Sequence, residues 1–277
     1  LAHANDPDCD QAFLREKFKI GTLDNPIYPG LFERTSLLVG CSIFAADLAF
    51  QNRTVFFCAG GTHHGRPDRA SGFCFTNDPV FALRHWLNKG LQRVAYIDFD
   101  AHHGDGVEDA FIKDPRVLTI SVHEQKRWPN SGTGSTESAL NFPVHKGFDD
   151  QEFSMLLRTK IHPALDRFKP EAVLVMSGAD ALQDDPLCGG CDHRLFDPSA
   201  ANRHMARALL QLRLNRGDGL CPGRLFHRPY DQRLDVADAH HPHGERRAVH
   251  AHGGARRICR RSEEHTSELQ SRQYLVC

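Results

Sequence analysis

Apolar and polar residues alternate along the first 180 residues in a pattern that predicts strands separated by helices. Strand-sized runs rich in β-branched and aromatic residues occupy 54–58, 94–100, 117–123 and 172–176. Helix-length stretches occupy 31–50, 79–91 and 149–168. Strands that alternate with helices predict an α/β fold, a three-layer and mostly parallel sheet with helices on both faces. In such sheets, functional residues gather at the carboxyl ends of the strands.

The composition changes after residue 188. All eight lysines lie at or before Lys169, whereas 189–261 contains fourteen arginines and no lysine. We interpret 1–188 as the folded domain, truncated at its N-terminus, 189–261 as a poorly ordered frameshifted segment and 262–277 as adapter-derived sequence. The alternative is a basic, histidine-rich tail that binds phosphate or metal. We therefore expect 189–277 to lack a packed core.

Charge and composition exclude several classes of partner. The formal net charge is −1 and the sequence pI is about 7.1, so we expect neither nucleic acid nor a membrane as a partner. The longest apolar runs are strand-sized, too short to cross a bilayer. Nine cysteines without regular spacing predict reduced thiols and a cytoplasmic location. The sequence does not indicate the oligomeric state.

Three polar residues follow the 94–97 run at intervals of two. Period-two spacing places Asp98, Asp100 and His102 on one face, where two carboxylates and an imidazole suit a divalent cation. Asp180 follows the last predicted strand and completes, with Asp100 and His102, a ligand set that leaves a position open for water and a substrate oxygen. The alternative is an ordinary polar turn, with Asp180 as a helix cap.

His63 and His64 follow the 54–58 strand and are candidate proton carriers. A histidine exchanges protons near neutral pH when a carboxylate orients its other nitrogen, and Asp98 and Asp105 are available for that. The alternative for two adjacent histidines is one core residue and one surface residue.

Four strings together resemble the zinc-dependent histone deacetylase family. They are Gly-Gly-Thr-His-His-Gly (60–65), Ala-Ser-Gly-Phe-Cys-Phe-Thr-Asn-Asp (70–78), Asp-Phe-Asp-Ala-His-His-Gly-Asp-Gly (98–106) and Ser-Gly-Ala-Asp-Ala-Leu-Gln-Asp-Asp-Pro (177–186). This family includes bacterial acetoin-utilisation and acetylpolyamine deacetylases and has an arginase-like α/β fold. The match covers about residues 20–188 in the family's order.

The resemblance implies a role for each matched polar residue. The implied ligands of one catalytic zinc ion are Asp100, His102 and Asp180. His64 becomes the general base, with Asp105 behind it, and His63, paired with Asp98, becomes the electrostatic or acid partner.

The resemblance also implies a structural potassium or sodium ion and a substrate channel. The implied cation residues, which act partly through backbone carbonyls, are Asp98, Asp100, His102, Ser121 and Val122. Gly72 and Phe73 match one wall of the acyl-lysine tunnel, Trp128 lies near the opposing aromatic residue, and Asp24 resembles the rim aspartate that holds the substrate backbone.

One departure from the family concerns its oxyanion-stabilising tyrosine, which should lie in a glycine-rich stretch after the last predicted strand. Tyr230 and Tyr274 do not match that context. We therefore expect a truncated bacterial deacetylase for acetyl-lysine or acetylated polyamines, with little activity in this chain. The first alternative is an inactive metal-binding fragment or pseudoenzyme. The second is a binuclear manganese hydrolase of the arginase type, against which Gly-Phe-Cys-Phe at 72–75 argues.

Overall fold

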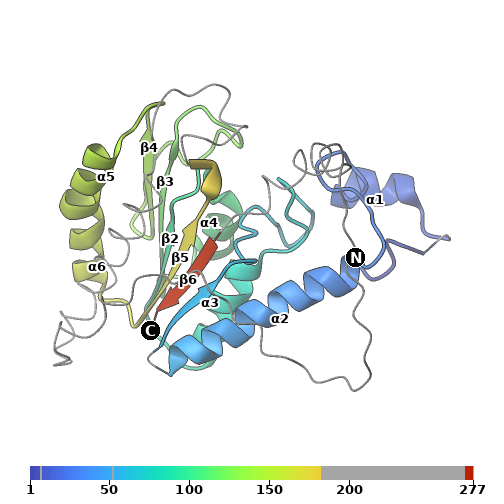
Figure 1. Ribbon diagram of the computed structural model, residues 1–277, viewed down its shortest axis with the longest axis horizontal. Helices are drawn as coiled ribbons and strands as arrows, with labels where there is room; N and C mark the ends of the chain where they lie inside the picture. The colour runs from blue at the N-terminus through green and yellow to red at the C-terminus, as the bar shows by residue number, and fades with distance from the viewer. Residues whose placement is uncertain (7, 52, 182–271, 277) are drawn as a thin grey trace, which may run out of the picture.

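A six-stranded sheet forms the centre of the computed structural model, which describes residues 1–6, 8–51, 53–181 and 272–276 (Figure 1). The strands are β1 (Thr54–Phe57), β2 (Val94–Asp98), β3 (Val117–Glu124), β4 (Ala139–Val144), β5 (Ala172–Ser177) and β6 (Arg272–Val276). Their order is β1-β6-β5-β2-β3-β4. Strands β5, β2, β3 and β4 run parallel, whereas β6 is antiparallel to both of its neighbours.

Helices cover both faces of this sheet. They are α1 (Gln11–Phe18), α2 (Leu31–Phe50), α3 (Asp78–Asn88), α4 (Asp105–Phe111), α5 (Asp150–Leu156) and α6 (His162–Phe168). Helices α2, α3 and α4 lie on one side of the sheet, and α5 and α6 lie on the other (Figure 1). None of the described helices combines the length and apolar character needed to cross a membrane.

The core divides into two layers because alternate residues of each buried strand face opposite ways. Val94 and Tyr96 pack with α2, α3 and α4, and the largest fully buried side chain there is Trp86 of α3. Ala95 and Ile97 pack instead with α5 and α6. The predicted three-layer α/β fold is therefore confirmed.

Several elements differ from the sequence-based prediction, which did not include the eight-residue helix α1. The helix expected over 149–168 is interrupted by a π-helical turn at Leu157–Ile161, next to Pro163, whose missing N–H cannot continue the regular ladder. Strand β4 was not predicted because Asn141 and Pro143 break its apolar pattern, and proline is tolerated at this edge position. Helix α4 was not predicted because it has only seven residues.

Residues 189–277, which we expected to lack a packed core, contribute one described strand, β6. Strand β6 lies between β1 and β5 and pairs with both. Its sequence, Arg-Gln-Tyr-Leu-Val, has the aromatic and branched residues that favour strands, and its pairing satisfies backbone groups on the facing sides of β1 and β5. The predicted domain boundary at residue 188, the segment 189–261 and most of the segment 262–277 lie outside the described residues.

Candidate metal centre and active site

The candidate metal ligands come from the ends of two neighbouring parallel strands. Asp98 ends β2 and pairs in register with Met176 of β5, so the segments that follow leave the sheet side by side. Asp100 and His102 lie in the turn after β2, and Asp180 lies in the short helical turn Ala179–Ala181 after β5. The topology therefore brings together residues far apart in the sequence.

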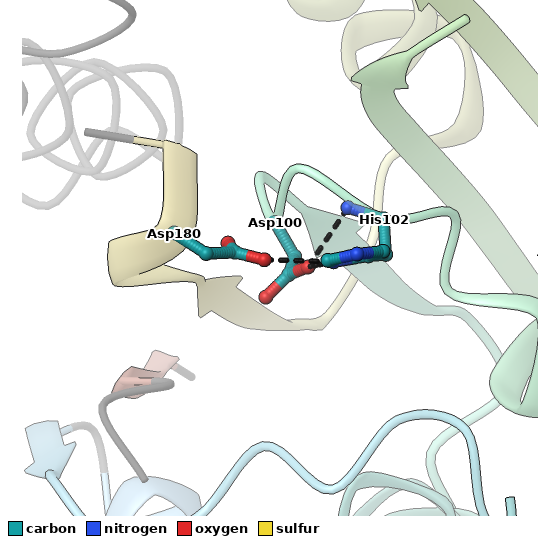
Figure 2. A group of neighbouring side chains, drawn as sticks. All are labelled: Asp100, His102 and Asp180. Carbon is teal, nitrogen blue, oxygen red and sulfur yellow. Dashed lines mark hydrogen bonds and ion pairs between the residues drawn. The ribbon is translucent and has the colours of Figure 1, made fainter. Parts of the chain in front are cut away.

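The three side chains converge on one point (Figure 2). Each offers a ligand atom, and these atoms lie within 4.8 Å of one another. His102 Nδ1 is 2.7 Å from Asp180 Oδ2 and 3.1 Å from Asp100 Oδ1. Among the described residues, this is the group of histidine, cysteine and acidic side chains with the geometry of a metal site.

The backbone around this point holds the carboxylates in place. The N–H of His102 donates to Asp100 Oδ1 at 2.8 Å, and the N–H of Ala101 donates to Asp180 Oδ1 at 3.2 Å. Gly178 is required because a Cβ there would collide with Asp100 Oδ2 and lie 2.5 Å from Asp180 Oδ1. The sequence Ser-Gly-Ala-Asp therefore allows β5 to approach the turn after β2 closely.

The electrostatics of the three residues favour a cation. Burial opposes a charge on His102, but the hydrogen bonds to Asp100 and Asp180 raise the pKa of His102 to about 10. Burial and the negative charge of Asp180 raise the pKa of Asp100 to about 6. Two carboxylates that stabilise positive charge at Nδ1 offer the same stabilisation to a divalent cation, so the donor set fits a zinc-type ion.

His63 and His64 lie beside this group, each paired with its own aspartate. His63 Nδ1 is 2.7 Å from Asp98 Oδ2, and His64 Nδ1 is 2.7 Å from Asp105 Oδ1. Burial opposes a charged His63 ring, but Asp98 and Asp100 raise the pKa of His63 to about 9. Burial and the positive charge of His63 lower the pKa of His64 to about 4. At neutral pH, His63 is therefore charged and His64 is neutral.

Further residues orient the two aspartates. The hydroxyl of Tyr96 donates to Asp98 Oδ2 at 2.6 Å, and the backbone N–H of Asp100 donates to Asp98 Oδ1 at 3.0 Å. Arg66 donates to the Asp105 oxygen that does not contact His64. Neither Tyr96 nor Arg66 was predicted, because their contacts cross between segments that no sequence spacing relates.

Two adjacent residues at the start of α3 hold the loop that carries the histidine pair. Asn77 donates to the carbonyl oxygens of His63 (2.9 Å) and Gly65 (3.0 Å), which flank His64. Asp78 is fully buried and accepts from the Ser42 hydroxyl and from both the N–H and the hydroxyl of Thr62. Neither residue was predicted. Asn77 is also the N-cap of α3, and an asparagine just before a helix is the one signal in the sequence that could have drawn attention to it.

Two of the residues expected to form the substrate channel, Gly72 and Trp128, lie against His64. The Trp128 ring is 4.7 Å from the His64 ring between centroids, and a Cβ at Gly72 would lie 2.5 Å from the indole. Phe73 and Trp128 are 47% and 46% exposed, which leaves their surfaces accessible to a ligand. Asp24 is exposed in the segment before α2, and its role at the rim stays a prediction.

The predicted monovalent-cation site also stays a prediction. Its residues are close in the sheet, because Asp98 of β2 pairs in register with Ser121 of β3, next to Val122. The Ser121 hydroxyl is 2.9 Å from His123 Nδ1, an interaction that the sequence did not indicate.

The fold and these residues define an α/β protein with a candidate metal centre at the carboxyl edge of its sheet. The family model described as "Histone deacetylase domain" matches residues 2–213. The chain therefore belongs to the histone deacetylase family.

Several individual proteins resemble the chain over nearly two thirds of its length. It is 38% identical to the acetoin utilization protein AcuC of Bacillus subtilis over 183 residues, covering 62% of this chain and 47% of that protein. It is 37% identical to human histone deacetylase 1 over 187 residues, covering 64% of this chain and 38% of that protein. The chain thus spans less than half the length of these relatives.

A solved structure shares the fold. The crystal structure of a histone deacetylase homologue complexed with SAHA aligns with a TM-score of 0.57 and 34% sequence identity. The alignment covers 63% of this chain and 50% of that structure.

Proposed function

We propose that this chain carries the metal-binding half of a zinc-dependent deacetylase that hydrolyses the amide of acetyl-lysine or of acetylated polyamines. The observation that carries the proposal is the convergence of Asp100, His102 and Asp180 beside two histidines with opposite pKa shifts. Family membership supports the same reaction class.

Asp100, His102 and Asp180 would hold the zinc ion. When bound, zinc supplies a Lewis acid that polarises the amide carbonyl and makes water more acidic. Three protein ligands are typical of catalytic rather than closed structural zinc sites, because they leave a position open. A potassium or sodium ion near Asp98 and Ser121 would have a structural role.

His64 would act as the general base. Its low pKa keeps the ring neutral, and Asp105 fixes the ring and stabilises the charge that forms when it takes a proton from water. His63 would remain protonated next to Asp98 and could donate to the leaving amine or stabilise negative charge on the reacting amide. The two rings thus divide the acid and base roles between them.

The second candidate function is metal binding without catalysis. The observation that favours it is the absence from the sequence of a glycine-rich stretch with a matching tyrosine, the residue expected to stabilise the oxyanion. Loss of one such donor typically costs about 2.7–4 kcal/mol of transition-state stabilisation. For this reason we expect little turnover by the 277-residue chain itself.

The two functions are distinguished by assaying the chain beside a version in which the reading frame after codon 188 has been repaired. The repaired protein should hydrolyse an acetyl-lysine peptide or an acetylpolyamine and lose activity with a zinc chelator. His64→Ala should lower kcat by about 10²–10⁴-fold while zinc stays bound. A repaired protein that binds zinc but hydrolyses neither substrate would contradict the deacetylase proposal and favour silent metal binding.

A further inference from the structure

A second buried polar cluster lies behind the metal ligands. Its histidines, His103 and His123, are each 3% exposed, and their ring centroids are 4.8 Å apart. His103 follows the candidate ligand His102 in the chain, but its ring contacts a different group: His103 Nε2 is 3.0 Å from Glu108 Oε2 of α4. None of the catalytic roles described above uses this cluster.

The cluster reaches the loop of residues 125–138 between β3 and β4, which we call the indole loop because it carries Trp128. His103 Nδ1 is 2.8 Å from the Ser131 hydroxyl. A carboxylate only accepts hydrogen bonds, so Nε2 carries a hydrogen toward Glu108, while Nδ1 on the opposite side of the ring is bonded to the Ser131 hydroxyl. One imidazole thus links α4 to the indole loop.

Glu108 holds the same loop through a second side chain. Its Oε2 accepts from Asn141 Nδ2 at 2.8 Å, and that amide nitrogen also donates to the carbonyl oxygen of Gly134 at 3.0 Å. The indole loop is therefore anchored at Ser131 and at Gly134 by groups that converge on one carboxylate.

The backbone of the indole loop lies directly on the two histidine rings. Gly132 has a φ of +68°, and a Cβ there would lie 2.7 Å from a ring carbon of His103 and 2.7 Å from a ring carbon of His123. Lys126 and Asn130 also have positive φ values, of 61° and 62°. Residues with side chains adopt this conformation infrequently, and asparagine does so more readily than lysine.

The anchoring determines where the Trp128 indole lies. The Trp128 ring is 4.7 Å from His64 and 6.1 Å from His102 between centroids, and it is 46% exposed. An indole held in this way presents an apolar face beside the proposed general base, on which the alkyl chain of a substrate can pack. If the loop moved, this face would be lost.

We propose that His103, supported by Glu108, is a positioning residue that anchors the indole loop and thereby fixes Trp128 as a wall of the channel for an acylated alkylamine. The channel part rests on the proposed function, whereas the anchoring does not. The adjacent histidines of the Asp-Ala-His-His sequence then have separate tasks, His102 at the metal and His103 at the loop.

Acrylamide quenching of tryptophan fluorescence tests the anchoring without any activity. The chain has two tryptophans, and Trp86 is completely buried, so quenching reports on Trp128. Ser131→Ala and His103→Phe should both raise the quenching constant while zinc stoichiometry stays the same. Ser138→Ala is the matched control, because its hydroxyl lies on the same loop but donates to the carbonyl oxygen of Ile112 at 3.3 Å. It should change nothing.

Kinetics of the frame-repaired protein test the channel wall. Ser131→Ala should raise KM for an acetylated amine by about fivefold, the factor that the loss of one ordinary hydrogen bond produces, with a smaller change in kcat. An increased quenching constant with an unchanged KM would contradict the role of Trp128 as a channel wall.

An unchanged quenching constant in both Ser131→Ala and His103→Phe would overturn the proposal that His103 anchors the indole loop. If His103→Phe does not fold, the quenching constant of Ser131→Ala alone decides. A repaired protein without deacetylase activity would contradict the proposed function, while the quenching result would still decide the anchoring.

Discussion

The rings of His63 and His64 lie 3.9 Å apart between centroids, yet their pKa values are shifted in opposite directions. The difference arises from their surroundings, because His63 faces Asp98 and Asp100, whereas His64 is buried next to the positive charge of His63. The neutral ring of His64 can therefore accept a proton, whereas the charged ring of His63 can donate one.

This relationship predicts two separate titrations in the metal-free chain. NMR of the imidazole signals should show His64 losing its proton near pH 4 and His63 near pH 9. In His63→Gln, removal of the neighbouring positive charge should raise the pKa of His64 toward its ordinary value. An unchanged His64 titration in this variant would contradict the coupling between the two rings.

A second prediction concerns Asp78, which holds the loop that carries these histidines. Asp78→Ala removes a buried carboxylate that accepts from the hydroxyls of Ser42 and Thr62 and from the backbone N–H groups of Gly61 and Thr62. We expect the free energy of unfolding, measured by urea denaturation, to fall by about 2–5 kcal/mol.

The control for this prediction is Asp68→Ala, which removes an exposed carboxylate whose partner Arg69 lies 3.0 Å away. Exposed ion pairs contribute about 0–1 kcal/mol, so the unfolding free energy should change little. Equal losses in Asp68→Ala and Asp78→Ala would mean that Asp78 is not a structural support of the loop.

A third prediction concerns the close approach at Gly178. Gly178→Ala places a methyl group against Asp100 and Asp180, so zinc affinity measured by competition with a chelator should fall by about 10–100-fold. Gly40→Ala is the control, because nothing lies within 4 Å of a Cβ at that position in α2. Gly40→Ala should leave zinc affinity unchanged, and wild-type affinity in Gly178→Ala would contradict the assignment of the site.

Much of the fold could be predicted because local patterns determine it. The strands β2 and β5 are apolar runs that each end in one polar residue, and they were found within two residues of their observed ends. Helix α2 begins and ends as its apolar stretch indicated. The edge strand β4 was missed because an exposed edge requires neither an apolar run nor the absence of proline. Strand β6 was missed because its pairing depends on β1 and β5, which are distant in the sequence.

The candidate site was predictable to the extent that its residues lie at strand ends. Period-two spacing placed Asp100 and His102 together, and the parallel order of β2 and β5 brought Asp180 to them. The supporting contacts of Asn77, Arg66 and His103 could not be predicted, because each depends on how two loops pack against each other. Such packing is set by tertiary contacts rather than by local periodicity.

The most direct test of the central claim, that Asp100, His102 and Asp180 hold a zinc ion, is X-ray absorption spectroscopy of the zinc-loaded chain. The account predicts one zinc ion with only nitrogen and oxygen ligands at about 2.0–2.2 Å, including one imidazole whose signal disappears in His102→Ala. The chain has nine cysteines, among them Cys188 and Cys191, which could bind zinc elsewhere. A sulfur shell at about 2.3 Å, or an imidazole signal that survives in His102→Ala, would contradict the account.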